Sequence, residues 1–192
     1  MEQNRTHNSA AAVRRQQQIE LCLYENLRHI PFQSISVSDL CRQVGISRKA
    51  FYNYYPDKEA CLCAIIDHTL RESVLHITAG VGDNASPLEA STVLLEYWKE
   101  KKELFDILVR NNLVHLLLLR NMEYVLREDH TVLDLLNTPD VRSDTDILAC
   151  CMSSMLTLVL QWHFRGFDTP AEEMARKLLR LLHAPMFHQS EA

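Results

Sequence analysis

The sequence predicts an all-α protein. Its 192 residues include only four glycines and six prolines, too few for a loop-rich β fold, and residues that favour helices, such as Leu, Glu, Arg and Ala, are common. The 47% apolar fraction is enough to bury a core without disulfides or a metal ion. We expect a helical unit over residues 1–56 and a larger helical bundle over 57–192, with a long helix over 57–77 connecting the two.

The distribution of charge points to the first third of the chain as the place for a nucleic-acid partner. The formal net charge is −5, but residues 1–60 carry eight Lys or Arg against six Asp or Glu, so the acidic excess lies in the remainder. Six cysteines without a disulfide pattern, and an N-terminus without an apolar signal segment, predict a cytoplasmic protein. The apolar run 147–164 includes Ser, Thr, Gln and His, so we expect a buried helix and no membrane span.

The first helix is expected over about 10–29, and the proline at position 31 prevents its continuation. Its apolar positions recur at spacings of three or four residues, the pattern of a helix with one buried face. These positions are Ile19, Leu23, Leu27 and Ile30.

Two short helices around a glycine are expected next. Ser36 and Asp39 are three residues apart, so each side chain can accept a hydrogen bond from a free backbone N–H at the start of the first helix. Gly45 supplies the positive φ of a tight turn, and Ser47 can cap the second helix. The expected ranges are 37–44 and 47–55, and such a pair is the outline of a helix-turn-helix.

The rest of the chain is also expected to be helical. Asp57 can cap the connecting helix, whose apolar face includes Leu62, Ile66 and Leu70. The stretch 79–87 holds two of the four glycines and is the clearest linker. Further helices are expected over about 88–101, 103–109, 112–136, 143–165 and 170–183.

The second short helix has a face suited to nucleic acid. Arg48 and Tyr52 are one helical turn apart. Lys49 and Asn53 have the same spacing, so the four side chains share one face. Arg and Lys bind phosphates and the acceptor edge of guanine, Asn pairs with adenine, and a Tyr hydroxyl donates to a phosphate. This chemistry is typical of a recognition helix that binds double-stranded DNA.

Residues 36–55, with the Asp57-Lys58-Glu59 step that follows, resemble the DNA-binding signature of TetR/AcrR-type transcriptional regulators. The shared pattern is a capped helix, a glycine turn, an aromatic cluster and a Lys-Glu opening of the fourth helix, in one order and at fixed spacing. The signature covers about a quarter of the chain, and the total length and helical remainder also match. The steps Pro31-Phe32 and Ser47-Arg48-Lys49 are most similar to the branch named for the dihydroxyacetone-kinase regulators.

The resemblance implies a homodimer that places the third helix of each chain in the major groove of a palindromic operator. It also implies a C-terminal domain that binds a small molecule, so the expected function is a ligand-responsive repressor. It assigns Ser36 to a phosphate, Ser47, Arg48, Lys49 and Asn53 to the groove, and Tyr52, Tyr54 and Lys58 to phosphates. Tyr52 and Tyr54 can alternatively pack in the core. Tyr55 departs from the family, in which phenylalanine is more common, and its hydroxyl needs a partner if it is buried.

A strip of small residues predicts the dimer interface. Ala149, Ser153 and Thr157 recur every four residues, so a partner helix can approach closely. The last helix adds Met174, Leu178 and Leu181. The alternative is that the small strip packs inside one chain.

The C-terminal bundle is also expected to hold the effector. Apolar and aromatic side chains outnumber charges in the helices between about 88 and 165, which predicts an apolar or aromatic ligand, with His115 as its polar anchor. The other expected lining residues are Tyr97, Trp98, Phe105, Leu108, Tyr124, Met155 and Trp162. A solid core without a cavity is the alternative.

No cofactor or metal ion is expected, because His115, His130 and His163 have no recognised ligand spacing. Two other functions remain open. A small helical enzyme could use His115 or His163 as its base. Asp144 or Asp146 would then be the partner, although no nucleophile–base motif supports this. A helical interaction module could instead keep the helix-turn-helix as a scaffold.

Overall fold

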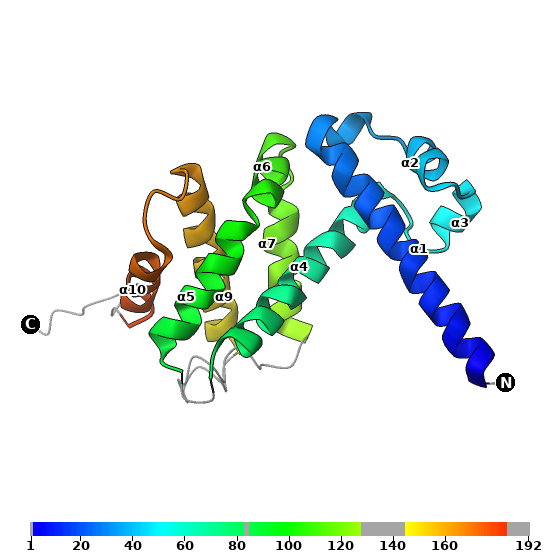
Figure 1. Ribbon diagram of the computed structural model, residues 1–192. Helices are drawn as coiled ribbons and strands as arrows, with labels where there is room; N and C mark the ends of the chain where they lie inside the picture. Colours follow the sequence, from blue (N-terminus) through cyan, green and yellow to red (C-terminus); the bar gives the residue numbers. More distant parts are fainter. Residues whose placement is uncertain (1, 83–84, 128–144, 184–192) are drawn as a thin grey trace, which may run out of the picture. The chain divides into compact units, whose positions relative to one another are not determined.

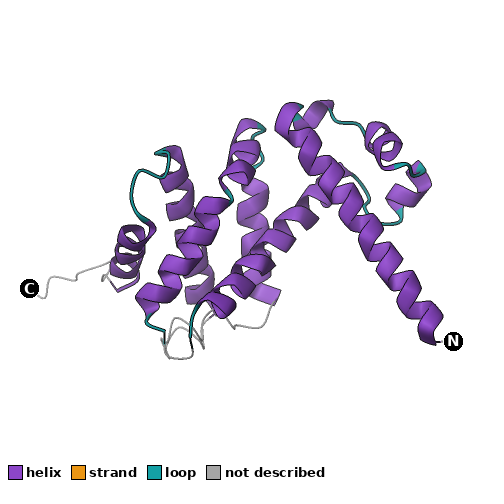
Figure 2. Ribbon diagram, in the orientation of Figure 1, coloured by secondary structure: helices purple, strands orange, loops and turns teal. Residues whose placement is uncertain are grey.

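The computed structural model describes residues 2–82, 85–127 and 145–183. In these ranges the chain forms helices, turns and loops and no strand (Figure 1, Figure 2), so the all-α prediction is confirmed. The chain divides into two compact units. The first holds the described residues up to His68 together with Ile107–Leu113, and the second holds Thr69–Asp106 and the described residues from Val114 onward.

The first unit joins two short helices and the start of a long one to α1. Its elements are α1 (Glu2–His29), a 3₁₀ turn (Phe32–Ser34), α2 (Val37–Val44), α3 (Arg48–Tyr52) and α4 (Lys58–Gly80) as far as His68. Its fully buried side chains include Ile19, Leu23, Leu27, Leu40, Phe51, Leu62 and Ile66. Ile30 is exposed because it follows the last residue of α1, so its place in the expected apolar stripe is wrong.

The turn between α2 and α3 forms as the sequence predicts. Gly45 ends α2 with φ 72° and ψ 38°, the left-handed conformation that glycine adopts without steric cost. Ser47 caps α3 by accepting a hydrogen bond from the N–H of Ala50 at 3.1 Å. α3 is shorter than expected and ends at Tyr52, with Asn53 as its C-cap, because the chain tightens there into a turn with a bond between residues three apart.

The second unit is a helical bundle. Its elements are the rest of α4, α5 (Pro87–Glu100), α6 (Lys102–Arg110) as far as Asp106, α7 (Val114–Arg127), α9 (Thr145–Phe164) and α10 (Ala171–His183). α5 packs against α10, and α7 packs against α9. The buried side chains of this core include Leu95, Trp98, Phe105, Leu156, Val159, Trp162, Met174 and Ala175.

Two boundaries differ from the prediction. The helix expected over 112–136 begins at Val114, because Asn112 has a left-handed φ of 57° after α6; the residues from 128 to 144 lie outside the described part. The expected division at residue 56 also differs, because α4 contributes to both units and Ile107–Leu113 joins the first.

Among the described helices, none is both long enough and apolar enough to cross a membrane.

Candidate functional site

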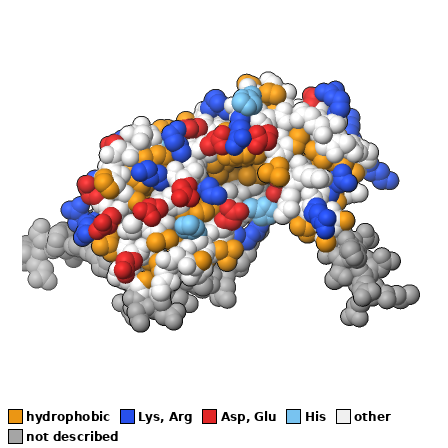
Figure 3. Space-filling view, in the orientation of Figure 1, with side chains coloured by type: hydrophobic (Ala, Val, Ile, Leu, Met, Phe, Trp, Pro, Cys, Tyr) orange, Lys and Arg blue, Asp and Glu red, His pale blue; other side chains and the backbone are white. Residues whose placement is uncertain are grey.

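α3 presents the polar face that the sequence predicts. Phe51 points into the core of the first unit and is fully buried. The side chains expected at a groove are exposed, together with Tyr52: Ser47, Arg48, Lys49, Tyr52 and Asn53. On the face drawn in Figure 3, Lys and Arg side chains (blue) lie over the region of α1 to α3. This part of the surface therefore combines cations with polar side chains that can reach a ligand.

Arg48 and Tyr52 contact each other along α3. Nη2 of Arg48 donates a hydrogen bond to the Tyr52 hydroxyl at 3.3 Å, and the guanidinium carbon lies 5.9 Å from the centre of the ring. Tyr52 is 45% exposed, so packing in the core, the alternative for this side chain, is wrong. Tyr54 is half-buried. The Tyr52 side chain thus holds the Arg48 guanidinium on the exposed side of the helix.

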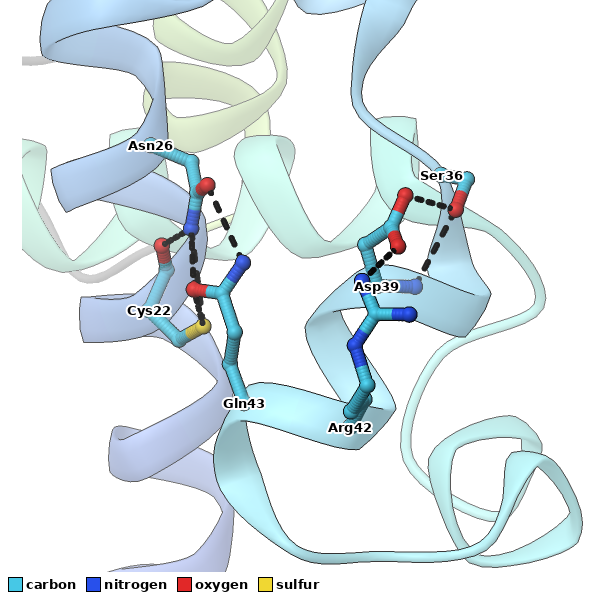
Figure 4. Close-up of polar contacts among 6 residues, drawn as sticks. All are labelled: Cys22, Asn26, Ser36, Asp39, Arg42 and Gln43. Atoms are coloured by element: carbon cyan, nitrogen blue, oxygen red, sulfur yellow. Dashed lines mark hydrogen bonds and ion pairs between the residues drawn. The ribbon is translucent and has the colours of Figure 1, made fainter.

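A reciprocal amide pair fixes α2 on α1 (Figure 4). Nδ2 of Asn26 donates to Oε1 of Gln43 at 2.8 Å, and Nε2 of Gln43 donates back to Oδ1 of Asn26 at 3.3 Å. The thiol of Cys22 donates to the same Gln43 oxygen at 3.3 Å. Because a tight turn joins α2 to α3, the pair also restricts α3. Sequence reasoning missed it, since one Asn and one Gln on two helices have no diagnostic spacing.

The start of α2 carries a carboxylate beside Ser36 (Figure 4). The N–H of Asp39 donates to the Ser36 hydroxyl at 3.0 Å, as expected for an N-cap. The Asp39 side chain was expected to accept from the backbone N–H of Ser36. Its Oδ2 instead accepts from the hydroxyl of Ser36 at 2.6 Å. This bond, with Arg42 on the other carboxylate oxygen, lowers the pKa of Asp39. The proton of the Ser36 hydroxyl is therefore already donated within the chain.

The described hydrogen bonds of Lys58 are to backbone carbonyls of its own chain. Its ammonium nitrogen donates to the carbonyl oxygens of Phe32, Gln33 and Ile35 at 2.6, 3.3 and 2.8 Å, and lies 4.5 Å from the centre of the Phe32 ring. An ammonium group has three N–H donors, and all three are used. Burial lowers the pKa of this group. The phosphate contact expected at Lys58 stays a prediction, and in the structure this residue holds the backbone that leads into α2.

The hydroxyl of Tyr55 has the partner that its burial requires. It donates to Oε1 of Glu20, whose other carboxylate oxygen lies 2.9 Å from Nδ1 of His68. Tyr55 and Glu20 are both buried, and burial together with this bond raises the pKa of Tyr55. Sequence reasoning missed Glu20, because a single Glu on an amphipathic helix normally indicates the solvated face.

Most of the residues expected to bind an effector are packed in the core of the second unit. Five of these expected residues are packed in that core and are at most 5% exposed: Tyr97, Trp98, Phe105, Met155 and Trp162. The Tyr97 hydroxyl donates to the carbonyl of Thr69 at 2.8 Å, and Nε1 of Trp162 donates to the carbonyl of Thr169 at 3.1 Å. Tyr124 is half-buried. The structure therefore brings the expected aromatic residues together, with their rings filling the core.

His115 and Leu108 do not join this core. His115, the expected polar anchor, is exposed on α7. Leu108 is fully buried, but it belongs to Ile107–Leu113, which packs in the first unit. Neither residue is therefore grouped with the expected aromatic lining residues in the structure.

The buried histidine of the second unit is His163. Its side chain is 8% exposed, and its Nε2 lies 2.7 Å from Oδ1 of Asp106. Desolvation alone would raise the pKa of Asp106, but the hydrogen bonds from Lys102 and His163 outweigh it, so this pKa is lowered. The aspartates expected to pair with a histidine in an enzyme, at positions 144 and 146, have side chains outside the described part.

Four buried polar atoms of the second unit have no hydrogen-bond partner within the described part of the chain. They are Oγ of Ser91, Nε1 of Trp98, Nδ2 of Asn121 and Nδ1 of His163. Buried polar groups normally have a partner, so these four atoms are exceptions within the described part of the chain. A cavity of about 650 Å³ lies elsewhere in this unit, between the end of α4, the start of α5 and Glu172. In the described ranges, no three His, Cys, Asp or Glu side chains gather as metal ligands.

The small strip of α9 is only partly covered. Thr157 is exposed, and Ala149 and Ser153 are half-buried. Met174 and Leu178 of α10 are buried within the chain, where α10 packs on α5, so neither can contact a second chain and their place in the expected interface is wrong. The side chain of Leu181 lies outside the described part.

The first unit has the geometry of a helix-turn-helix domain, the class of domain that bacterial regulators use to contact DNA. Residues 27–65 match the family model described as "Bacterial regulatory proteins, tetR family". The HTH-type transcriptional regulator EthR of Mycobacterium tuberculosis strain H37Rv is 44% identical over 43 residues, which are 22% of this chain and 20% of EthR. The Mycolicibacterium smegmatis EthR is 48% identical over 42 residues, or 22% of this chain and 19% of that protein. The match thus spans about a fifth of the length of these relatives.

Longer similarities extend over the helical bundle. The uncharacterized HTH-type transcriptional regulator YxbF of Bacillus subtilis strain 168 is 27% identical over 161 residues, which cover 79% of this chain and 40% of YxbF. The fatty acid degradation regulator FadR of Bacillus halodurans has a similar fold, with a TM-score of 0.57, 14% identity, and coverage of 91% of this chain and 97% of that one. The dihydroxyacetone kinase operon activator DhaS aligns with a TM-score of 0.53 and 18% identity over 88% of this chain and 93% of DhaS.

A further solved structure, the FadR repressor of Thermus thermophilus in complex with lauroyl-CoA, has a TM-score of 0.52 and 20% identity over 92% of this chain and 98% of that one. At this identity the three structures show a shared fold. The family match and the EthR similarity fall on α2, α3 and the start of α4, where the helix-turn-helix was described above. Together these findings show that residues 27–65 are similar to the DNA-binding region of TetR-type regulators, and that the chain has a fold similar to the three solved structures.

Proposed function

We propose that this chain is a DNA-binding transcriptional repressor that a small molecule releases from a palindromic operator. The observation that carries the proposal is the exposed face of α3, where Arg48, Lys49 and Asn53 stand directly after the Gly45 turn. Side chains of these types reach base edges and phosphates in a major groove. The N-terminal turn of the second helix is the part that a helix-turn-helix inserts, and here it carries both cations.

The experiment is capture of genomic DNA fragments from the source organism on the purified chain, followed by sequencing. Fragments with a common palindrome are expected, because a two-fold dimer reads two equivalent half-sites. The control is a double variant, Arg48→Ala with Lys49→Ala, checked for an unchanged helical content. Recovery of the same fragments by this variant would overturn the role of α3.

We further propose that two chains associate through α9. Thr157 is exposed near the middle of this helix, and Phe164 at its end is an exposed large apolar side chain. A two-fold dimer of TetR type would present its two α3 helices about 34–36 Å apart, one turn of DNA, or a multiple of that distance. Thr157→Arg should shift the chain toward monomer in sedimentation, whereas the same change at Thr78, exposed on α4, should not. A dimeric Thr157→Arg variant would exclude this interface.

The effector is proposed to bind among α5, α6, α7 and α9 of the second unit. Support comes from the aromatic core and from two buried atoms without a hydrogen-bond partner in the described part of the chain, Nε1 of Trp98 and Nδ1 of His163. The rings of both residues contact the Phe105 ring, with 5.8 Å between the ring centres for Trp98 and 5.4 Å for His163. His163 therefore takes the anchor role first expected at His115. An apolar or aromatic molecule with one hydrogen-bonding group matches the chemistry of these side chains, and it would have to displace packed rings, because the cavity described above lies elsewhere in this unit.

Release from DNA is proposed to follow a shift of α4, the helix that has residues in both units. A coupling of ~1–3 kcal/mol would weaken operator binding about 5- to 150-fold. A thermal-shift screen tests this; it should include an acyl-CoA, the ligand class named for the Thermus thermophilus FadR. Compounds that raise the melting temperature should release operator DNA near their dissociation constants, and His163→Phe should weaken both effects. Stabilising compounds that leave operator affinity unchanged would contradict the coupling.

A further inference from the structure

The backbone between α1 and α2 is held by polar side chains from a segment about 80 residues further along the chain. This segment, Ile107–Leu113, belongs to the first unit although most of α6 belongs to the second. Two of its side chains, Arg110 and Asn111, bond to main-chain groups of the helix-turn-helix unit. Neither residue is part of the family match over residues 27–65.

Arg110 caps the end of α1. Its Nη2 donates to the carbonyl oxygens of Leu27 and Arg28 at 2.6 and 3.1 Å. The last four carbonyls of a helix have no partner within the helix, and a cation at this end also interacts favourably with the helix dipole. α1 has no glycine or Schellman turn at its end, since Pro31 follows almost directly. Arg110 therefore supplies the cap that the local sequence lacks.

Asn111 holds the first residue of the 3₁₀ turn. Its Oδ1 accepts a hydrogen bond from the N–H of Phe32 at 2.7 Å, and its Nδ2 donates to the carbonyl of Ile107 at 2.8 Å. Both ends of the amide are thus engaged, so the acceptor is fixed in place. The left-handed Asn112 that follows turns the chain away after this contact.

The same backbone is held from the other side by Lys58. Its ammonium donates to the carbonyls of Phe32 and Ile35, so the backbone of Phe32 is bonded through its N–H to Asn111 and through its C=O to Lys58. Ser36, the N-cap of α2, comes directly after Ile35. The direction in which α2 leaves α1 therefore depends on these three side chains.

We propose that Arg110 and Asn111 are positioning residues for DNA recognition: they set the orientation of α2, and through the Gly45 turn that of α3, without touching DNA. This inference rests on the proposed function, because it assigns to the pair an effect on operator binding. The segment Ile107–Leu113 would then contribute to DNA binding, because it fixes the orientation of the helices that contact DNA.

The test uses the full chain with Asn111→Ala, which removes the acceptor, and Asn111→Asp, which keeps an Oδ1 acceptor. Hydrogen exchange of the Phe32 amide reports directly on its hydrogen bond to Asn111, and fluorescence anisotropy with the captured operator duplex reports DNA binding. A part-buried N–H that loses its acceptor destabilises the conformation that buries it, which shifts the equilibrium away from that conformation by about 5- to 150-fold. We expect Asn111→Ala to speed Phe32 exchange and weaken operator binding within this range, while the amides of Leu62 and Ile66 stay protected.

Rescue by the conservative variant separates positioning from general destabilisation. Asn111→Asp should retain more Phe32 protection and more operator affinity than Asn111→Ala, because it keeps the acceptor for the Phe32 N–H, although its second oxygen then faces the carbonyl of Ile107. Arg110→Ala should weaken operator binding as Asn111→Ala does. Arg176→Ala is its matched control: it removes a cation from an exposed pair with Glu172 on α10 and should leave binding unchanged.

The outcomes are distinguishable. If the wild-type chain binds the operator and Asn111→Ala binds equally well, the positioning role is wrong. It is also wrong if Asn111→Ala and Asn111→Asp lose affinity to the same extent, or if Phe32 exchange does not change. If the wild-type chain selects no DNA at all, the proposed function fails first, and the positioning role fails with it.

Discussion

The hydroxyl of Tyr55 donates a hydrogen bond to the buried carboxylate of Glu20, 35 residues earlier in the chain. The bond connects the end of the helix-turn-helix to the middle of α1. A buried carboxylate is costly unless its oxygens are bonded, and here the second oxygen contacts His68 of α4. One side chain of α1 thus joins three parts of the first unit.

Tyr55→Phe should destabilise the first unit. The ring still fills its place, but Glu20 loses one of its two partners while it stays buried, so we expect a loss of ~1–3 kcal/mol in the free energy of unfolding. Urea unfolding followed by circular dichroism measures this value. Tyr52→Phe is the control, because the Tyr52 hydroxyl is exposed and should cost much less. Equal losses in the two variants would mean that the bond to Glu20 contributes little.

The same bond predicts a loss of stability in alkali. Burial and the bond to Glu20 raise the pKa of Tyr55 above its ordinary value of about 10. The stabilisation is therefore complete below about pH 10 and decreases as the pH rises above that value, where the unfolded chain ionises first. Between about pH 9 and 11 the wild type should lose more stability than Tyr55→Phe does. Parallel stability curves for the two proteins would contradict this.

Lys58→Met should act on stability and not on phosphate binding. The methionine keeps much of the apolar stem but leaves three carbonyl oxygens without their donor, so we expect a cost of ~1–3 kcal/mol in unfolding free energy. Operator affinity should fall by a similar factor at every salt concentration. A salt slope reduced by about one unit, with stability unchanged, would instead restore a phosphate contact at Lys58.

Arg48→Ala and Lys49→Ala should reduce sequence discrimination. Both side chains are exposed on the first turn of α3, and loss of a contact to a base edge costs ~1–3 kcal/mol and relaxes specificity at one position of the site. Binding to duplexes with single base changes measures this effect. Arg42→Ala is a matched control, since Arg42 already pairs with Asp39 on α2. If both α3 variants weakened all duplexes equally, their contacts would be to phosphates only.

The local signals of the first unit were readable from the sequence, because caps and tight turns depend on a few neighbouring residues. Ser47, Gly45 and Asp57 act in the structure as their positions predict. The faces of α1 and α3 also followed, since helical spacing places Leu23 inside and Lys49 outside.

The remaining errors concern contacts between distant segments. The carbonyl partners of Lys58 could not be predicted, because the family pattern does not record which carbonyls surround its ammonium. Glu20 and Asn111 went unnoticed, since their partners are 35 and 79 residues away. In the second unit, composition identified the aromatic core, but the exposed His115 was chosen as the anchor although His163 lies in the apolar run 147–164, which was expected to be a buried helix.

The α3 face should read a DNA sequence, and salt-dependent fluorescence anisotropy with the captured palindrome tests this directly. The wild-type chain should bind the palindrome at least about 10³-fold more tightly than a scrambled duplex of the same length. The logarithm of the affinity should fall linearly with the logarithm of the salt concentration, with a slope of about −0.9 for each phosphate contacted. Equal affinity for the palindrome and the scrambled duplex at every salt concentration would contradict the claim.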